Sequence, residues 1–295
     1  MRWLSCLAAL TLAGGSFAQE SFVVAPSEPQ ERPFLGSDRG FTNFIGFLTN
    51  PTQAIDPRAL TQAWPIFTST WTPELGRLPA GDFQGYGAGI NLALTERLSI
   101  GMNKGGYATA DFRRYRDGWL DLGGFVQYTV VRDVENQFLA TLGLCWTAPM
   151  GSKELFQGSG PAYLAPYLTL GKEFGDWHVL LNAGYSFPAG EDKVPIRNFY
   201  GTLHIDRQVL GWIYPVLEVN WQAATTEVNL QLPTPQGIVD LGTITGAGTL
   251  VTVSPGVNFV LVRDQLEWGF AYQTPIYTQR DFQYHQFLTR MVIRF

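Results

Sequence analysis

The 295-residue sequence predicts an all-β fold, a single antiparallel up-and-down transmembrane β-barrel of about 12 strands. Segments of alternating polar and apolar residues follow one another from residue 63 to the end, the breaks between them are alternately short and long, and the last strand has one apolar and one charged face. Charged residues make up only 15% of the chain, and beyond the N-terminus no stretch reaches the roughly 18 apolar residues of a membrane-spanning helix. If a chain of this composition crosses a bilayer, it does so as strands.

Residues 1–18 have the pattern of a secretory signal peptide. Arg2 is followed by an apolar stretch over 3–13, and a small-x-small cleavage site, Ser16-Phe17-Ala18, ends before Gln19. The expected mature chain keeps a single cysteine, Cys145, which excludes an internal disulfide.

Residues 19–62 are predicted to form a periplasmic leader. Apolar residues recur there at a spacing closer to a helix than to a strand, at Phe41, Phe44, Ile45, Phe47 and Leu48. The leader therefore forms either an ordered segment packed on the barrel rim, which we favour, or a plug in the barrel mouth. Asp56 before Pro57 suits a helix N-cap followed by the first helical position, so a short helical turn is expected through Ala59 to Gln62.

The barrel itself is predicted over 63–295. The expected strands cover 63–72, 82–95, 97–108, 118–132, 136–147, 161–174, 177–188, 198–207, 211–224, 248–262, 265–276 and 283–295. An even number of strands is typical of bacterial single-chain barrels, as are short periplasmic turns and longer extracellular loops. The longest break, 225–247, is the most prominent candidate surface loop.

The alternation also assigns the faces of each strand, because side chains alternate with a period of two. In 118–132 the expected lipid-facing residues are Leu120, Leu122, Val126, Tyr128 and Val130. These strands are about ten residues or longer, whereas strands of soluble sheets usually have five or six.

The last nine residues resemble the C-terminal signature of bacterial outer-membrane barrels, which ends on an aromatic residue. Phe287, Met291, Ile293 and Phe295 share one face and form the candidate assembly signal. The barrel-assembly machinery and outer-membrane lipid are the partners that this resemblance implies, and the outer membrane is the expected location.

Functional residues are sought in the lumen. The charged lumen and selectivity candidates are Asp121, Glu218, Glu267, Arg290 and Arg294. A cross-strand ion pair between Glu267 and the two arginines is favoured over a charged constriction that selects solutes. Lumen glycines such as Gly89, Gly101 and Gly143 either relieve curvature or leave space for a solute.

His178, His204 and Asp206 are the one group that could bind a transition metal, provided that strands 177–188 and 198–207 pair. Hydrogen bonding among polar lumen residues is the favoured alternative, so no cofactor or metal is expected. Some twelve-stranded barrels are lipid hydrolases with His-x-Ser on a strand, but none of the histidines here is followed by that pattern. No catalytic residue is therefore predicted.

Three runs of sequence resemble those of a group of uncharacterised bacterial outer-membrane proteins. The first is 56–61 together with the following Trp64-Pro65-Ile66-Phe67, the second is 93–99, and the third is Ile213-Tyr214-Pro215 together with the following 218–221. This group is similar to the putative transporter family of the phenol meta-degradation pathway. The resemblance implies a barrel that takes up small solutes, including hydrophobic or aromatic ones.

We therefore expect a passive channel for small molecules, without enzymatic activity and without nucleic acid as a partner. A non-conducting structural or surface-binding barrel that works through its extracellular loops is the alternative, and a lipid hydrolase is less favoured. An autotransporter barrel is disfavoured because 19–62 is short for a passenger domain.

Overall fold

The computed structural model describes residues 33–72, 80–111, 116–155, 157–158, 160–190, 197–225, 239–240, 243–244, 248–279 and 284–295. The elements are β1 (Gln62–Thr72), β2 (Gly81–Ala93), β3 (Leu98–Lys104), β4 (Gly106–Asp111), β5 (Gly118–Trp119), β6 (Leu122–Asp133), β7 (Phe138–Ala148), the 3₁₀ turn η1 (Lys153–Leu155), β8 (Tyr163–Phe174), β9 (Trp177–Pro188), β10 (Asn198–Arg207), β11 (Ile213–Ala224), β12 (Val239–Asp240), β13 (Thr243–Ile244), β14 (Thr249–Val262), β15 (Leu266–Thr278) and β16 (His285–Arg294).

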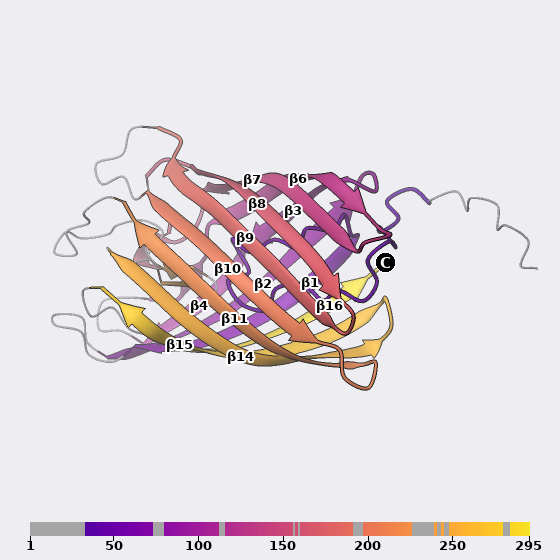
Figure 1. The fold of residues 1–295 in the computed structure, drawn as a ribbon. Helices are drawn as coiled ribbons and strands as arrows, with labels where there is room; N and C mark the ends of the chain where they lie inside the picture. Colours follow the sequence, from indigo (N-terminus) through magenta and orange to yellow (C-terminus); the bar gives the residue numbers. More distant parts are fainter. Residues whose placement is uncertain are drawn as a thin grey trace, which may run out of the picture. The chain divides into compact units, whose positions relative to one another are not determined.

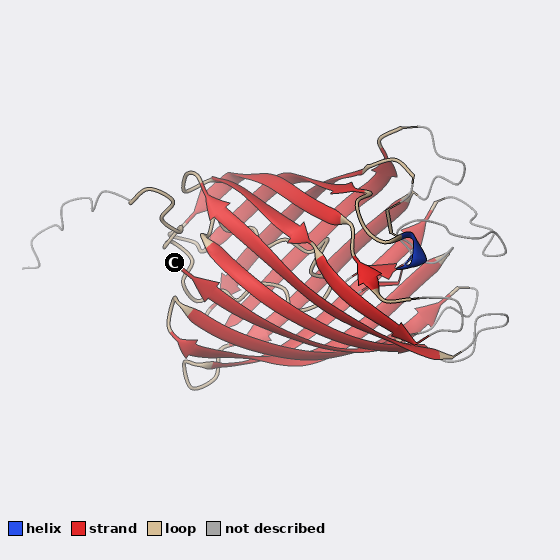
Figure 2. Ribbon diagram, turned by 180° about the vertical axis from the view of Figure 1, so that it is seen from behind, coloured by secondary structure: helices blue, strands red, loops and turns tan. Residues whose placement is uncertain are grey.

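The strands close into a barrel, as Figures 1 and 2 show. Each strand pairs antiparallel with its neighbours, and β1 pairs with both β2 and β16, so the sheet has no free edge at this seam. The strand expected over 97–108 is divided into β3 and β4, and the strand expected over 118–132 is divided into β5 and β6. When each divided strand is counted once, the structure is the predicted 12-stranded antiparallel barrel. Among the described residues, no helix is long and apolar enough to cross a membrane.

The strand expected over 97–108 is broken at Gly105, between the end of β3 and the start of β4. Gly106 has φ +144, and a Cβ there would lie 2.1 Å from the carbonyl oxygen of Tyr86, so only glycine fits. The next strand, which pairs with this one, is interrupted at Leu120 and Asp121, between β5 and β6. Leu120 is buried among lumen residues rather than facing lipid, so its predicted face is wrong: the interruption shifts the parity of the alternation.

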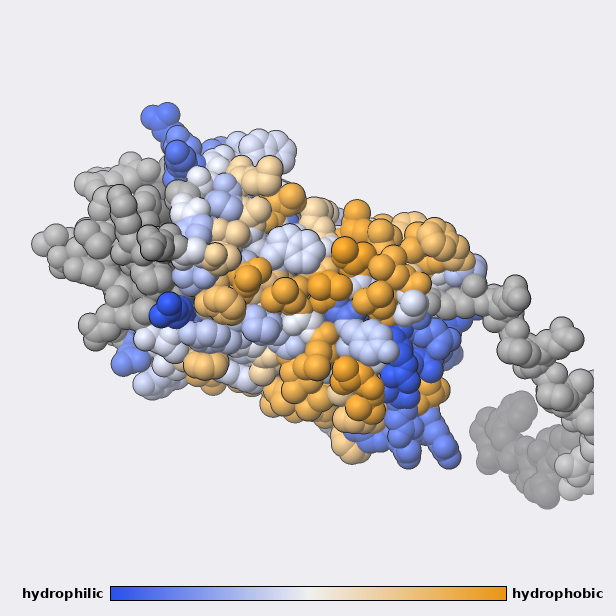
Figure 3. Space-filling model, turned by 90° about the horizontal axis from the view of Figure 1, so that it is seen from above, coloured by the Kyte–Doolittle hydropathy of each residue, from blue (hydrophilic) through white to orange (hydrophobic). Residues whose placement is uncertain are grey.

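Outside the barrel the side chains are apolar, and inside they are mostly polar. Exposed positions on β6 include Leu122, Val126, Tyr128 and Val130, whereas Gln127 and Thr129 between them are 2% exposed. Figure 3 shows hydrophobic residues gathered along the middle of the barrel wall, with hydrophilic residues toward its ends. An apolar exterior around a polar interior is the arrangement of an outer-membrane barrel.

Residues 34–61 are here called the plug: Phe34 at its start is 91% exposed, whereas nearly all residues from 44 onward are buried inside the lumen and do not lie on the rim. All five residues of the predicted helical stripe are at most 1% exposed, yet none is helical. The helical turn expected over Ala59 to Gln62 is also absent. Asp56 Oδ1 accepts a hydrogen bond of 3.0 Å from the Arg58 backbone N–H, and the chain then passes directly into β1 at Gln62.

Lumen glycines make room for neighbouring aromatic rings. Cβ atoms at Gly89 and Gly143 would lie 2.2 Å from the rings of Trp64 and Tyr167, respectively. These rings join a buried cluster that contains Ile55 of the plug. The predicted roles, relief of curvature or space for a solute, do not account for this arrangement, because side chains of the barrel itself fill the space at these glycines.

Candidate functional site in the plugged lumen

The plug forms a loop that extends into the barrel from the end with the short turns and returns to that end. Its first part is fixed by Arg132 near the β6–β7 turn, whose Nη2 lies 2.6 Å from Asp38 Oδ1. Its deepest part contacts Asn103 on β3, which donates to the Thr52 carbonyl. At the return, the backbone N–H of the terminal Phe295 donates to the Thr61 carbonyl at 3.0 Å. In Figure 1 the indigo chain accordingly runs inside the ring of strands.

Arg58 holds the loop of the plug together. Its Nη1 donates to the carbonyls of Phe41 and Phe44 at 3.1 and 2.7 Å, and its Nη2 lies 2.7 Å from Asp56 Oδ2. Burial alone would raise the pKa of the Asp56 carboxyl, but the charge and hydrogen bonds of Arg58 outweigh it and hold this pKa below its ordinary value of 3.8. Burial likewise opposes the charge of Arg58, and Asp56 nevertheless raises the pKa of the guanidinium.

Glu218 on β11 is the main wall contact at the tip of the plug. Its two carboxylate oxygens accept hydrogen bonds of 2.7 Å from the backbone N–H groups of Leu48 and Thr49, and it also accepts one from the Thr49 hydroxyl. The Leu48 side chain occupies space that the strands leave free, because Cβ atoms at Gly256 and Gly269 would lie 3.2 and 2.3 Å from its methyl groups. The sequence predicted Glu218 as a lumen residue, and its partners in the plug were not foreseen.

Behind Glu218, the predicted histidine group forms a buried chain of hydrogen bonds. His204 Nδ1 lies 2.7 Å from Glu218 Oε1, and His204 Nε2 lies 2.9 Å from Asp206 Oδ2. Asp206 Oδ1 lies 2.6 Å from His178 Nδ1. β9 and β10 pair as expected, so the proximity of the histidines is confirmed. The described residues hold no group of three or more His, Cys, Asp or Glu arranged for a metal ion.

The plug supplies aromatic rings to both histidines. Phe47 lies edge-on to His204 with ring centroids 5.8 Å apart, and the Phe44 ring lies 5.1 Å from that of His178. The chain of carboxylates and imidazoles is thus covered by the plug, and side chains of all its members are fully buried.

Of the ion pair predicted between Glu267 and two arginines, the described residues show the half made by Arg294. Glu267 Oε1 lies 2.5 Å from Arg294 Nη1, and both side chains are less than a tenth exposed. Arg290 is 8% exposed and approaches the plug at Gly46, while its Nε has no hydrogen-bond partner among the described residues.

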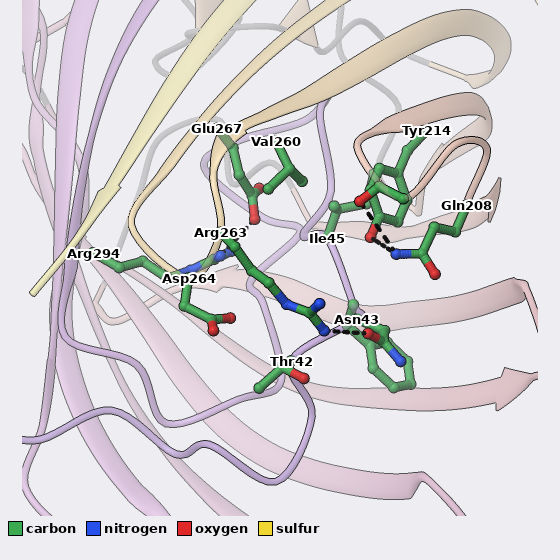
Figure 4. A pocket seen from close by; sticks show the side chains of 12 residues that line it. Thr42, Asn43, Ile45, Gln208, Tyr214, Val260, Arg263, Asp264, Glu267 and Arg294 are labelled. Atoms are coloured by element: carbon green, nitrogen blue, oxygen red, sulfur yellow. Dashed lines mark hydrogen bonds and ion pairs between the residues drawn. The ribbon is translucent and has the colours of Figure 1, made fainter. Parts of the chain in front are cut away.

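Near this pair, the plug and two periplasmic turns surround a small polar pocket, drawn in Figure 4. Arg263 lies 3.5 Å from Asn43 of the plug, and Gln208 donates to the Tyr214 hydroxyl at 2.8 Å on the other side of the pocket.

Asp121 lies at the opposite, extracellular end. Its Oδ1 accepts hydrogen bonds from the backbone N–H groups of Gly151 and Gly158 at 2.9 and 2.8 Å, which anchors the loop between β7 and β8. Leu155 of η1, the blue turn in Figure 2, packs in an apolar cluster with lumen residues including Phe83 and Leu288. This cluster was not predicted, because apolar residues had been assigned to the lipid face.

The remaining predicted residues lie elsewhere. In the candidate assembly signal, Phe287 and Phe295 are 36% and 77% exposed. Most of the candidate surface loop 225–247 lies outside the described residues, apart from Thr225 and the short β12–β13 pair. Sequence reasoning missed Arg58, although the neighbouring Asp56 and Pro57 had been singled out as a helix start.

No protein-family model matches the chain, and no curated protein matches it. Among solved structures, an outer-membrane channel from Pseudomonas putida F1 is similar with a TM-score of 0.59 at 12% identity, over 83% of this chain and 98% of that one. The NanC porin is similar with a TM-score of 0.51 at 8% identity, over 80% and 100% of the two chains. Likeness at these identities establishes the fold, and this fold with its apolar exterior is that of an outer-membrane β-barrel.

Proposed function

We propose that the protein is a passive outer-membrane channel for small molecules and that residues 34–61 close its pore. A closed barrel with a polar lumen supports a channel, and a 12-stranded barrel lies between filled eight-stranded barrels and open porins in size. The two similar solved structures are a channel and a porin. The observation that carries the proposal is the way in which the plug is held.

Many of the contacts that attach the plug are polar, and water can replace them. Glu218, Gln127 and Arg132 bind it through hydrogen bonds and an ion pair, as do threonine hydroxyls of the wall. Because water in an open lumen would satisfy the same wall groups, release of the plug leaves few of them unpaired. Apolar side chains of the plug also join clusters with wall residues, among them Leu139, Leu180 and Tyr214, so the closed state is the more stable one.

The narrower proposal is that the solute is small and hydrophobic or aromatic. It rests on the resemblance to the phenol meta-degradation barrels, and the apolar cluster with Phe83, Leu155 and Leu288 in the extracellular half of the lumen supports it.

Single-channel conductance in a planar bilayer tests the proposal. We expect the full-length protein to be mostly closed, and Arg58→Ala to raise the open probability because it removes the donor to Phe41 and Phe44 and leaves Asp56 unpaired. A chain without residues 19–61 should conduct continuously. The matched control is Arg207→Ala, whose side chain lies over the exposed Trp177 ring, away from the plug.

Heat-modifiable electrophoretic mobility shows whether each variant keeps its barrel. If Arg58→Ala and the truncated chain are folded by this measure and neither conducts, the channel proposal is wrong.

A further inference from the structure

The lumen wall binds the returning part of the plug through its main chain. Carbonyl oxygens of this stretch accept hydrogen bonds from neutral side chains on β3, β6, β7 and β8. The donors and acceptors are Asn103 to Thr52, Thr169 to Ile55 at 3.4 Å, Gln127 to Asp56 and Arg58 at 2.9 and 3.3 Å, and Thr129 and Thr141 to Pro57 at 3.2 and 2.7 Å. At the tip, Glu218 binds the two main-chain N–H groups already described.

Such contacts recognise a peptide backbone and do not read its sequence. Every residue of a polypeptide carries a carbonyl and, except for proline, an N–H group, so another extended segment could make the same hydrogen bonds. Main-chain hydrogen bonds supply affinity in the same way where peptides add to sheet edges. Side-chain contacts specific to this plug are found near its entrance and tip, at Asp38 and Asn50 for example. In the returning part, the Ile55 side chain joins the cluster with Trp64 and Tyr167.

Further amide groups line the lumen beyond the plug, toward the extracellular end. Asn198, Gln222 and Gln286 are 5% exposed or less, and each has a buried amide atom without a protein partner among the described residues. Amides offer a donor and an acceptor together, which is the complement of a peptide group. The peptide-binding wall therefore continues past the tip of the plug.

We propose that the channel also takes extended oligopeptides, which bind where the plug's own main chain now lies. This inference rests on the proposed channel function and adds a second class of solute to the small hydrophobic one. The plug then acts as a tethered competitor: a peptide in the lumen replaces its carbonyl contacts one for one, whereas a solute without peptide groups does not.

Binding to the purified full-length Arg58→Ala protein tests this proposal without relying on conductance. The probe is a fluorescent, uncharged peptide of roughly ten residues and unrelated sequence, long enough in extended form to cross the barrel. Fluorescence anisotropy should show binding that is stronger than to the wild type, where the plug competes. Maltohexaose and the peptide of residues 34–61 serve as competing ligands.

Wall variants locate the site. Thr129→Val with Thr141→Val in the same chain removes two hydroxyl donors at nearly constant volume and should weaken peptide binding on the order of tenfold. Thr169→Val is a second, milder variant. The control is Thr68→Val, which removes a lumen hydroxyl that has no hydrogen-bond partner in the described part of the chain, and it should leave peptide affinity unchanged.

The proposal is overturned if the unrelated peptide does not bind, if only the peptide of residues 34–61 binds, or if maltohexaose displaces the peptide at equal concentration. It is also overturned if the Thr129 and Thr141 variant binds as tightly as its parent in a folded barrel. If the channel conducts but does not bind peptides, the peptide inference is wrong and the proposed channel function stands. If the protein binds peptides but does not conduct, the proposed channel function is wrong.

Discussion

Replacing Glu218 by glutamine should open the channel without unfolding the barrel. The amide oxygen of the new side chain can occupy the position of Oε1 and keep the hydrogen bonds with the Leu48 N–H and His204. Its NH₂ group then faces the Thr49 N–H, which becomes a buried donor without an acceptor.

The size of this effect follows from the hydrogen bonds that the substitution removes or weakens. A buried donor left unsatisfied costs about 1–3 kcal/mol, and the remaining bonds lose their charge assistance. We expect about 3 kcal/mol against the closed state, which corresponds to a roughly 150-fold larger ratio of open to closed channels.

Single-channel recording measures this ratio directly as the open probability. The control is Glu96→Gln on a periplasmic turn, where the carboxylate is half-exposed and lies 3.8 Å from Arg132, so the expected change is below about 1 kcal/mol. If Glu218→Gln and Glu96→Gln give the same open probability while both barrels show native heat-modifiable mobility, Glu218 does not hold the plug.

Three further outcomes are expected. Because the pKa of Asp56 is depressed in the folded protein, its charge stabilises the plug fully above pH 3.8, and this stabilisation is lost as the pH falls through the folded-state pKa. The open probability should therefore rise in acid, below about pH 4. Asp56→Asn should abolish this rise in open probability. Leu48→Ala leaves a gap beside Gly256 and Gly269 and should destabilise the plug by about 2–5 kcal/mol. This should be seen as an increased open probability with an unchanged melting temperature of the barrel. Asp121→Ala removes the acceptor of two loop N–H groups and should speed tryptic cleavage at Lys153, and equal cleavage rates would show that Asp121 does not anchor the loop.

The alternation of the sequence predicts the barrel because each strand meets lipid on one face and the lumen on the other. This holds for Val126 and Gln127 on β6 and for Glu218 on β11. It fails at Leu120, where a break between β5 and β6 changes the parity of the strand. A period of two carries no information about where such a break occurs.

The plug could not be predicted from periodicity because the barrel wall surrounds it. Phe41, Phe44 and Phe47 are all buried without lying on one face of a helix, so their spacing suggested a helical stripe that does not form. The contact between His204 and Glu218 depends on the register of β10 against β11, where these residues are direct partners. Which polar residues meet across the lumen follows from register, which the alternation leaves open.

The plug lies in the chain directly before β1, the strand that closes the barrel against β16, and this order bears on assembly. The seam joins residues far apart in sequence, such as Gln62 and Arg294, which are separated by 232 positions. Contacts of the plug with β6 and β11 join residues 71 and 170 positions apart. If Leu48 already contacts Glu218 when β1 pairs with β16, the chain between these two strands forms a shorter loop. The entropic cost of closing the barrel is then lower by roughly 1 kcal/mol. The segment that lies inside the finished barrel is thus also positioned to guide the first and last strands together.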